Sequence, residues 1–245
     1  MADSNEYPQL IDVSNHQGDI DWDAVKASGV VGAFVKATEG INFIDPYFQS
    51  NWIDMKRVGL YRGAYHFARP SRNSSTNEAN FFMDTMLDAG LEVGDILVQD
   101  MEDERVGVSQ DLGDWTLHFS QMIEMLAGYK PLLYTGGYYI REHNLGTPEL
   151  AQSGLWLAQY PSTLPANLPP VPSMWPVIAF WQYTSTGRTP GVNGNCDRNI
   201  FQGAAERIPL YGKPNTETPP TPNPVPPEID VAAIEERLVE IEGEL

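Results

Sequence analysis

Cysteine is almost absent from this chain of 245 residues, because Cys196 is the only one. An intrachain disulfide is therefore excluded, and stability has to come from packing. No histidine and acidic group are arranged around Cys196 as a nucleophile would require, so we expect it to be a small packing residue. His16 and His66 do not show metal-ligand spacing, and His66 is expected to be buried and hydrogen-bonded. The sequence predicts no metal site and no cofactor.

Positive charge is also scarce, with 15 Lys and Arg residues against 33 Asp and Glu and a net charge of −18. A nucleic-acid partner is not expected, since such binding depends on cations that neutralise phosphates. No apolar run approaches the roughly 20 residues of a membrane span. The first residues lack the basic and apolar regions of a secretory signal. We therefore expect a chain that stays in the cytoplasm of its host until another factor releases it.

Apolar runs of strand length alternate with helix-like stretches through most of the chain. This alternation predicts a mostly parallel sheet. For a chain of this length, we expect that sheet to close into a single TIM-like (β/α) barrel. The Pro-rich residues 161–176 cannot hold a long helix, so we expect an irregular barrel, flattened or incomplete. The predicted strands are 9–13, 32–37, 61–67, 96–100, 131–135, 155–160 and 177–183. The predicted helices are 21–27, 46–57, 76–89, 110–127 and 137–143.

The composition changes after Gly212, which divides the sequence into three parts. Residues 6–212 form the predicted catalytic domain, and 213–227 resemble a semi-rigid Pro-rich linker. Residues 228–245 are predicted to form a short amphipathic helix, which either docks on the body or mediates self-association as a coiled coil. Its apolar residues are spaced 3-4-3-4: Val231, Ile234, Leu238, Ile241 and Leu245.

Acidic residues follow several predicted strands, where the functional groups of such barrels lie. Asp12 ends the first strand, Asp100 and Glu102 end the fourth, and Asp197 lies near the end of the barrel region. Spacing of two places Asp100 and Glu102 on one face of an extended chain. Like charges held close raise the pKa of one group, which leaves an acid beside a carboxylate, as glycoside cleavage requires. An ordinary solvated acidic loop is the alternative.

An ordered series of motifs across about residues 9–212 resembles glycoside hydrolase family 25, the Chalaropsis-type lysozymes. The order of these blocks is far more specific than an isolated Asp-x-Glu. The motifs are residues 11–18 (IDVSNHQG), 34–40 (FVKATEG), 63–67 (GAYHF), 99–102 (QDME), 133–135 (LYT), 155–158 (LWLA), 180–183 (FWQY) and 196–199 (CDRN).

The resemblance implies a muramidase that cleaves the β-1,4 bond between N-acetylmuramic acid and N-acetylglucosamine in bacterial peptidoglycan. Glu102 corresponds to the general acid and Asp100 to its partner carboxylate, which either attacks or orients the acetamido group of the sugar. Asp12 and Asp197 correspond to the other two acids of the cleft. The single cysteine and the absent leader resemble a phage endolysin, which would reach the wall with the help of a holin.

Other motif residues are candidate substrate contacts. The resemblance implies that Tyr65 hydrogen-bonds the acetamido group or the carboxylate network, and packing in the core is the alternative for this residue. Tyr134, Trp156 and Trp181 lie in strand-like segments, where they either pack in the core or stack on sugar rings. Lys36 and Glu39 are expected to form an ion pair near the mouth of the barrel.

Two other functions fit parts of the pattern. A family 18 chitinase-like hydrolase also has an Asp-x-Glu ending, and Asp95, Asp100 and Glu102 match its motif, but Val98 replaces its second Asp. A barrel that binds glycans without cleaving them is the other alternative. The presence of all four acidic residues speaks against that reading.

Overall fold

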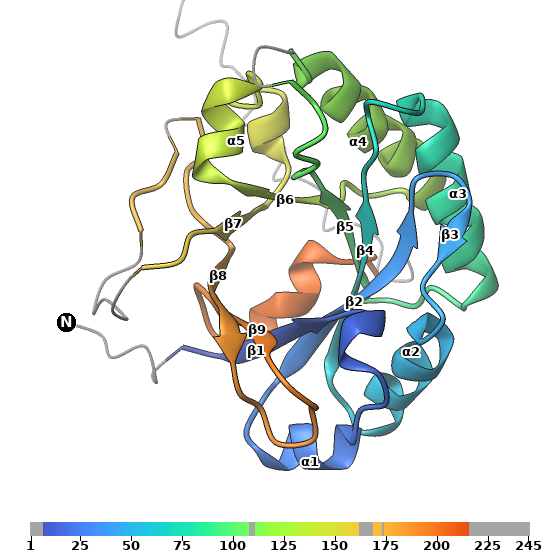
Figure 1. Cartoon of the computed structure of the whole chain (residues 1–245), viewed down its shortest axis with the longest axis vertical. Helices are drawn as coiled ribbons and strands as arrows, with labels where there is room; N and C mark the ends of the chain where they lie inside the picture. Colours follow the sequence, from blue (N-terminus) through green and yellow to red (C-terminus); the bar gives the residue numbers. More distant parts are fainter. Residues whose placement is uncertain (1–6, 108–110, 162–168, 173, 216–245) are drawn as a thin grey trace, which may run out of the picture. The chain divides into compact units, whose positions relative to one another are not determined.

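The computed structural model describes residues 7–107, 111–161, 169–172 and 174–215, and those up to Pro214 belong to one compact unit. Nine strands form one sheet in the order β1-β9-β8-β7-β6-β5-β4-β2-β3. Because β1 also pairs with β2, every strand except β3 belongs to a closed barrel (Figure 1). The strands are β1 (Gln9–Val13), β2 (Gly32–Glu39), β3 (Phe43–Ile44), β4 (Tyr61–Phe67), β5 (Ile96–Asp100), β6 (Leu132–Gly136), β7 (Leu155–Ala158), β8 (Phe180–Gly187) and β9 (Cys196–Phe201).

Helices cover the outside of the first part of the barrel (Figure 1). A side-chain cap marks the start of α3, where the Ser74 hydroxyl accepts a hydrogen bond from the amide of Asn77. Gly90 follows the end of that helix with a φ of +82°, a left-handed conformation that favours glycine. The helices are α1 (Trp22–Ala27), α2 (Phe48–Arg57), α3 (Ser75–Asp88), α4 (Gly113–Ala127) and α5 (Gly137–Glu142), with 3-10 turns η2 (Asn15–Gln17), η3 (Leu150–Gln152) and η4 (Ala205–Tyr211).

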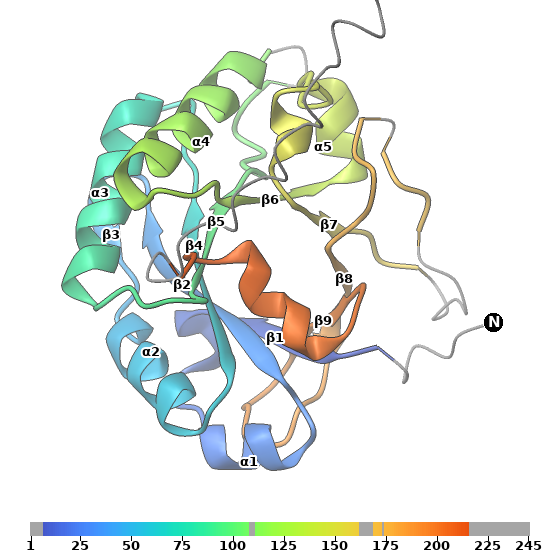
Figure 2. The ribbon, with the colours of Figure 1, turned by 180° about the vertical axis from the view of Figure 1, so that it is seen from behind.

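Large apolar side chains fill the interior of the barrel. Phe34 stacks on Trp156 with ring centroids 4.2 Å apart, and Phe180 meets Phe34 edge-on at 5.2 Å. Position 63 must be glycine for this packing, because a Cβ there would lie 2.1 Å from Cδ1 of Phe34. The orange η4 segment lies across the rear opening in Figure 2, and its Ile208 is fully buried against the interior cluster. The barrel is therefore a filled core with one open end.

The predicted TIM-like barrel is confirmed, and it is closed. Its irregularity has a structural cause: β7, β8 and β9 follow one another without a covering helix in the described segments, and β9 runs antiparallel to both its neighbours, β8 and β1. Strand β9 and the two-residue β3 were not predicted from the sequence. The predicted linker and C-terminal helix lie outside the described residues, apart from 213–215. None of the described helices is long and apolar enough to cross a bilayer.

Candidate active site

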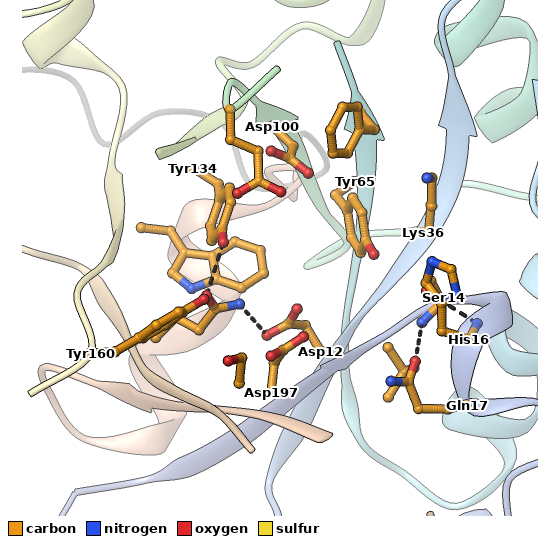
Figure 3. A pocket seen from close by; sticks show the side chains of 16 residues that line it. Asp12, Ser14, His16, Gln17, Lys36, Tyr65, Asp100, Tyr134, Tyr160 and Asp197 are labelled. Atoms are coloured by element: carbon orange, nitrogen blue, oxygen red, sulfur yellow. Dashed lines mark hydrogen bonds between the residues drawn. The ribbon is translucent and has the colours of Figure 1, made fainter. Parts of the chain in front are cut away.

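A cavity of about 290 Å³ opens at the end of the barrel where the parallel strands finish. All four predicted acidic residues line it, namely Asp12, Asp100, Glu102 and Asp197. In Figure 3, Asp12 and Asp197 lie close together, and Asp100 faces them from across the cavity. The structure thus brings together groups that are up to 185 positions apart in the sequence, here Asp12 and Asp197.

The strands explain how these carboxylates meet. Asp12 and Asp100 lie at the carboxyl ends of β1 and β5, which point to the same end of the barrel. Asp197 reaches this end because β9 is reversed, and it pairs in register with Asp12. Beyond β5, the amide of Met101 still donates to the carbonyl of Tyr134, which keeps the chain extended as far as Glu102. Met101 is buried on the other side, as the spacing predicted.

Asp12 is held firmly by two amide side chains. Its Oδ2 accepts hydrogen bonds from Gln182 Nε2 at 2.9 Å and from Asn199 Nδ2 at 2.8 Å. Burial and the charge of Asp197 nevertheless raise its pKa well above the usual range. This environment fixes the position of Asp12 while penalising its negative charge.

Asp100 is buried, and its Oδ1 has no hydrogen-bond partner among the described residues. Burial and the neighbouring charge of Glu102 raise its pKa well above the usual range, and Lys36 opposes this shift. A buried carboxylate oxygen without a partner is costly unless something else supplies a donor. A bound substrate can supply that donor.

Glu102 differs from Asp100 because its side chain remains accessible to solvent at the mouth. Its enclosure in the cavity still raises its pKa, as does the charge of Asp197, whereas the Tyr134 hydroxyl lowers it. The pKa of Asp197 is also raised by burial, and its interaction with Asp12 opposes this shift. A cluster of four carboxyls with raised pKa values retains protons closer to neutral pH than isolated carboxyls do.

Comparison with known proteins identifies the family. Residues 11–192 match glycosyl hydrolases family 25. Lysozyme M1 from Streptomyces globisporus is 34% identical over 211 residues, which cover 82% of this chain and 69% of that protein. This chain belongs to glycosyl hydrolase family 25. A crystal structure of a bacterial lysozyme from Streptomyces coelicolor matches with a TM-score of 0.74 and 32% identity, covering 84% of this chain and 97% of that one.

More distant family 25 relatives include the N,O-diacetylmuramidase of Chalaropsis sp, which is 26% identical over 207 residues, 77% of this chain and 95% of that protein. The predicted resemblance to this family is therefore confirmed. Family 25 membership also sets aside the family 18 interpretation, which the valine at position 98 had already weakened.

Aromatic side chains of this family 25 site surround the carboxylates. Tyr65 faces the cavity from β4, close to Asp100 in Figure 3, and Tyr134 and Trp156 also line the cavity. Trp156 is almost fully buried, and its indole N–H donates to Asn199 Oδ1 at 2.7 Å, so it forms part of the floor. The Tyr134 hydroxyl donates to Gln182 Oε1 at 2.9 Å.

Lys36 and Glu39 form the expected ion pair, with Nζ and Oε2 2.6 Å apart. Lys36 lines the cavity, whereas Glu39 lies behind it and also binds Arg69, whose Nε is 2.8 Å from Glu39 Oε1. Arg69 contacts Asp103 as well, at 2.8 Å. Glu39 therefore positions Lys36 and is not among the residues that line the cavity.

Trp181 requires a correction, because it does not line the cavity. Its side chain packs on the outside of the barrel wall with Leu133 and Ile200, and its indole N–H donates to the Gln159 carbonyl at 2.8 Å. Alternation along β8 explains this placement: Phe180 faces the interior, so Trp181 faces outward and Gln182 faces inward. Trp181 is a packing residue.

Several cavity residues escaped the sequence analysis. Tyr160 and Gln182 join the Asp12 network, since the Tyr160 hydroxyl donates to Gln182. A lone glutamine inside an apolar strand was the available signal for Gln182. Ser14, His16 and Gln17 line the side of the cavity next to Lys36, and the Ser14 and Gln17 side chains cap the η2 turn.

His66 and Cys196 have the environments expected from the sequence. His66 is fully buried, with Nδ1 2.7 Å from Thr38 Oγ1 and Nε2 2.8 Å from Glu78 Oε2, and burial lowers its pKa. Cys196 is buried, and desolvation raises the pKa of its thiol to about 12, which makes it a poor nucleophile. No cluster of potential metal ligands occurs among the described residues.

Proposed function

We propose that this chain is a muramidase that hydrolyses the β-1,4 bond between N-acetylmuramic acid and N-acetylglucosamine in peptidoglycan. The observation that carries the proposal is the convergence of Asp12, Asp100, Glu102 and Asp197 on one cavity. The names of the relatives support it, because they include lysozymes and N,O-diacetylmuramidases. The polar cavity can take a sugar ring and offers both an acid and a carboxylate to its glycosidic bond.

Glu102 is assigned the role of general acid. It is the most accessible of the four carboxyls, so it can reach a glycosidic oxygen at the mouth. Its pKa is raised, which keeps it protonated closer to neutral pH than a free glutamate. In the reaction, its proton passes to the departing oxygen as the bond to the anomeric carbon breaks.

Asp100 is assigned the task of orienting the acetamido group of the sugar that is attacked. The unpartnered Oδ1 of Asp100 can accept a hydrogen bond from the acetamido N–H, which aims the acetamido oxygen at the anomeric carbon. Tyr65, on the neighbouring strand, can hold the same group from its other side. The acetamido oxygen bonds to the anomeric carbon as the bond to the departing oxygen breaks, which gives a cyclic intermediate. Water, which loses a proton to Glu102, then attacks the anomeric carbon and breaks that bond, so that the anomeric configuration is retained.

Asp12 and Asp197 complete the negative wall of the site. Since amide donors hold Asp12 on the floor, it is placed to stabilise the positive charge that develops on the sugar ring. Asp197 lies beside it on β9 and adds to the same field.

The test combines product analysis with one substitution. Purified peptidoglycan is digested, and mass spectrometry of the reduced fragments identifies the sugar that carries each new reducing end. N-acetylmuramic acid is the expected sugar, and new N-acetylglucosamine ends would overturn the assignment. A cell-wall suspension that stays turbid and gains no new reducing ends would indicate a barrel that only binds glycans, and clearance without new reducing ends would indicate a lytic activity other than glycoside hydrolysis.

Glu102→Gln is expected to lower turnover by about a thousandfold or more, because the amide cannot donate the proton. Thermal stability should be nearly unchanged. Glu206→Gln is the matched control, since Glu206 is exposed in η4 at the other end of the barrel. Near-normal turnover in the Glu102 variant would refute its role as the acid.

A further inference from the structure

A second cavity of about 490 Å³ adjoins the site, beside α5 and the ends of β6 and β7. It shares two residues with the catalytic cavity, Glu102 and Tyr160. Half of its other lining residues come from α5 and the residues that flank it, and they include two adjacent tyrosines, Tyr138 and Tyr139. The two cavities together are large enough for more than one sugar of a glycan strand.

The shared Glu102 determines what each cavity would hold. A general acid lies between the sugar that is attacked and the sugar that departs, because it protonates the oxygen that joins them. Asp12, Asp100 and Asp197 all line the first cavity and do not line the second. The attacked sugar therefore belongs in the first cavity, and the departing sugar lies across Glu102 in the second.

The tyrosines of the second cavity have the chemistry to bind that sugar. Tyr138 and Tyr160 line this cavity and are 54% and 52% exposed, so their rings are accessible to a ligand. Such rings can stack on the apolar C–H face of a pyranose, and a tyrosine loses little conformational entropy on binding.

The Tyr139 hydroxyl is the second observation that points to a ligand. Tyr139 is only 7% exposed and packs against His143, with ring centroids 4.2 Å apart. Its hydroxyl is buried, yet it has no hydrogen-bond partner in the described part of the chain. A buried hydroxyl without a partner destabilises the empty protein, and a sugar hydroxyl or acetamido group in the cavity would satisfy it.

We propose that the second cavity is the binding site for the departing N-acetylglucosamine residue, with Tyr138 stacking on its ring and Tyr139 hydrogen-bonding to it. The inference rests on the proposed muramidase function and names the residues that recognise the leaving side of the substrate. It makes Tyr138 and Tyr139 determinants of substrate binding and assigns them no part in proton transfer.

The experiment compares two substrates that differ only on the leaving side. One is the tetrasaccharide of alternating N-acetylglucosamine and N-acetylmuramic acid. The other is the β-fluoride of the corresponding disaccharide, whose leaving group is a single atom. Tyr138→Ala is expected to lower kcat/KM on the tetrasaccharide by fivefold to tenfold, about the effect of one stacking contact, and to leave the fluoride within twofold. Tyr138 is a sharper probe than Tyr160, whose hydroxyl also donates to Gln182.

Tyr139→Phe provides an independent readout. Removing an unpartnered hydroxyl should leave the melting temperature unchanged or raise it, while kcat/KM on the tetrasaccharide falls by about threefold to tenfold. Leu87→Ala, on the exposed outer face of α3, is the control for both measurements. Equal losses on both substrates, or no loss on the tetrasaccharide, would overturn the proposal. Failure of the unsubstituted protein to cleave either substrate would instead overturn the muramidase function.

Discussion

The two ends of strand β5 carry aspartates that are equally buried and differently surrounded. Asp95 precedes the strand and Asp100 ends it, and each is 4% exposed. Arg62 binds both oxygens of Asp95, with Nε–Oδ1 and Nη2–Oδ2 distances of 2.8 and 2.6 Å, and the Glu92 amide donates to Oδ2 at 2.7 Å. Asp100 instead keeps an oxygen without a partner in the described structure and lies among other carboxyls.

This contrast separates a carboxylate that supports the fold from one that serves a reaction. The Arg62 guanidinium also stacks on the Trp52 ring, 4.1 Å from its centroid. The Arg62–Asp95 ion pair, called the rear pair below, is therefore embedded in the packing. At the mouth, Asp100 lacks a donor for one oxygen and lies close to like charges, which costs stability but prepares it for a substrate. The first predicted consequence is that substitutions at the two ends should have opposite effects on stability.

Arg62→Ala is expected to have the largest effect on stability. It leaves the buried Asp95 without its cation, a change that typically costs about 3–5 kcal/mol. Urea unfolding measures this loss as a lower midpoint with an unchanged slope. Activity per folded molecule should remain, because Arg62 lies at the other end of the barrel from the cavity. A loss below about 1 kcal/mol would remove the distinction between the two ends.

Asp100→Asn should change stability in the opposite direction. We expect a gain of about 1 kcal/mol at pH 7, since the variant no longer buries a carboxyl among like charges, and a loss of about a hundredfold in turnover. Thermal unfolding and muropeptide release measure the two effects.

The gain at position 100 should depend on pH in a defined direction. The pKa of Asp100 is raised in the folded protein, so the folded state binds its proton more tightly than the unfolded state. The stability of the natural protein should therefore fall, relative to the Asn variant, as the pH rises above about 4, where the unfolded carboxyl ionises. The difference should stop growing once the pH exceeds the raised pKa. A pH-independent difference would contradict this explanation.

Lys36→Met should have a smaller effect, on the pH profile of activity. The Lys36 charge lowers the pKa of both Asp100 and Glu102, so its removal should raise them. Because activity requires protonated Glu102, the alkaline limb of kcat should move to higher pH, by about half a unit. Lys56→Met removes a lysine whose partner is the exposed Glu92 near the rear pair, and it should leave the limb in place. A shift to lower pH in the Lys36 variant would contradict the sign of this interaction.

Much of the barrel could be predicted from the sequence because its strands are apolar on both faces. The predicted ranges for β1, β4 and β5 coincide with the observed strands. Strand β9 was missed because its residues Cys196, Asp197, Arg198 and Asn199 do not form an apolar run, although its last residues are buried. Its pairing with β1 and β8 depends on barrel closure, which local patterns do not encode.

The site was predictable where polar residues follow apolar strands, as at Asp12 and Asp100. The site was not predictable where two neighbouring residues of a strand are both large and apolar, because no polar residue then shows which of the two side chains faces the interior. Phe180 and Trp181 show this: either could face the interior, and only the packed barrel shows that Phe180 does. The cavity beside Tyr138 and Tyr139 was not predictable either, because two adjacent tyrosines in a sequence do not reveal that a cavity lies beside them.

The reversed strand β9 has a consequence for how this enzyme can be altered. Since β8 and β9 run in opposite directions, the connection between them, residues 188–195, is a hairpin at the mouth end that is followed by Cys196 and Asp197. From β1 to β7, by contrast, each connection between successive parallel strands of the barrel returns the chain to the far end through a helix. Gly191 packs against α1, and its carbonyl accepts a hydrogen bond from the Asp21 amide, whereas residues 193–195 are exposed. The exposed part can gain residues while both strands stay paired, so it offers a place to lengthen the wall of the cavity without rebuilding the barrel.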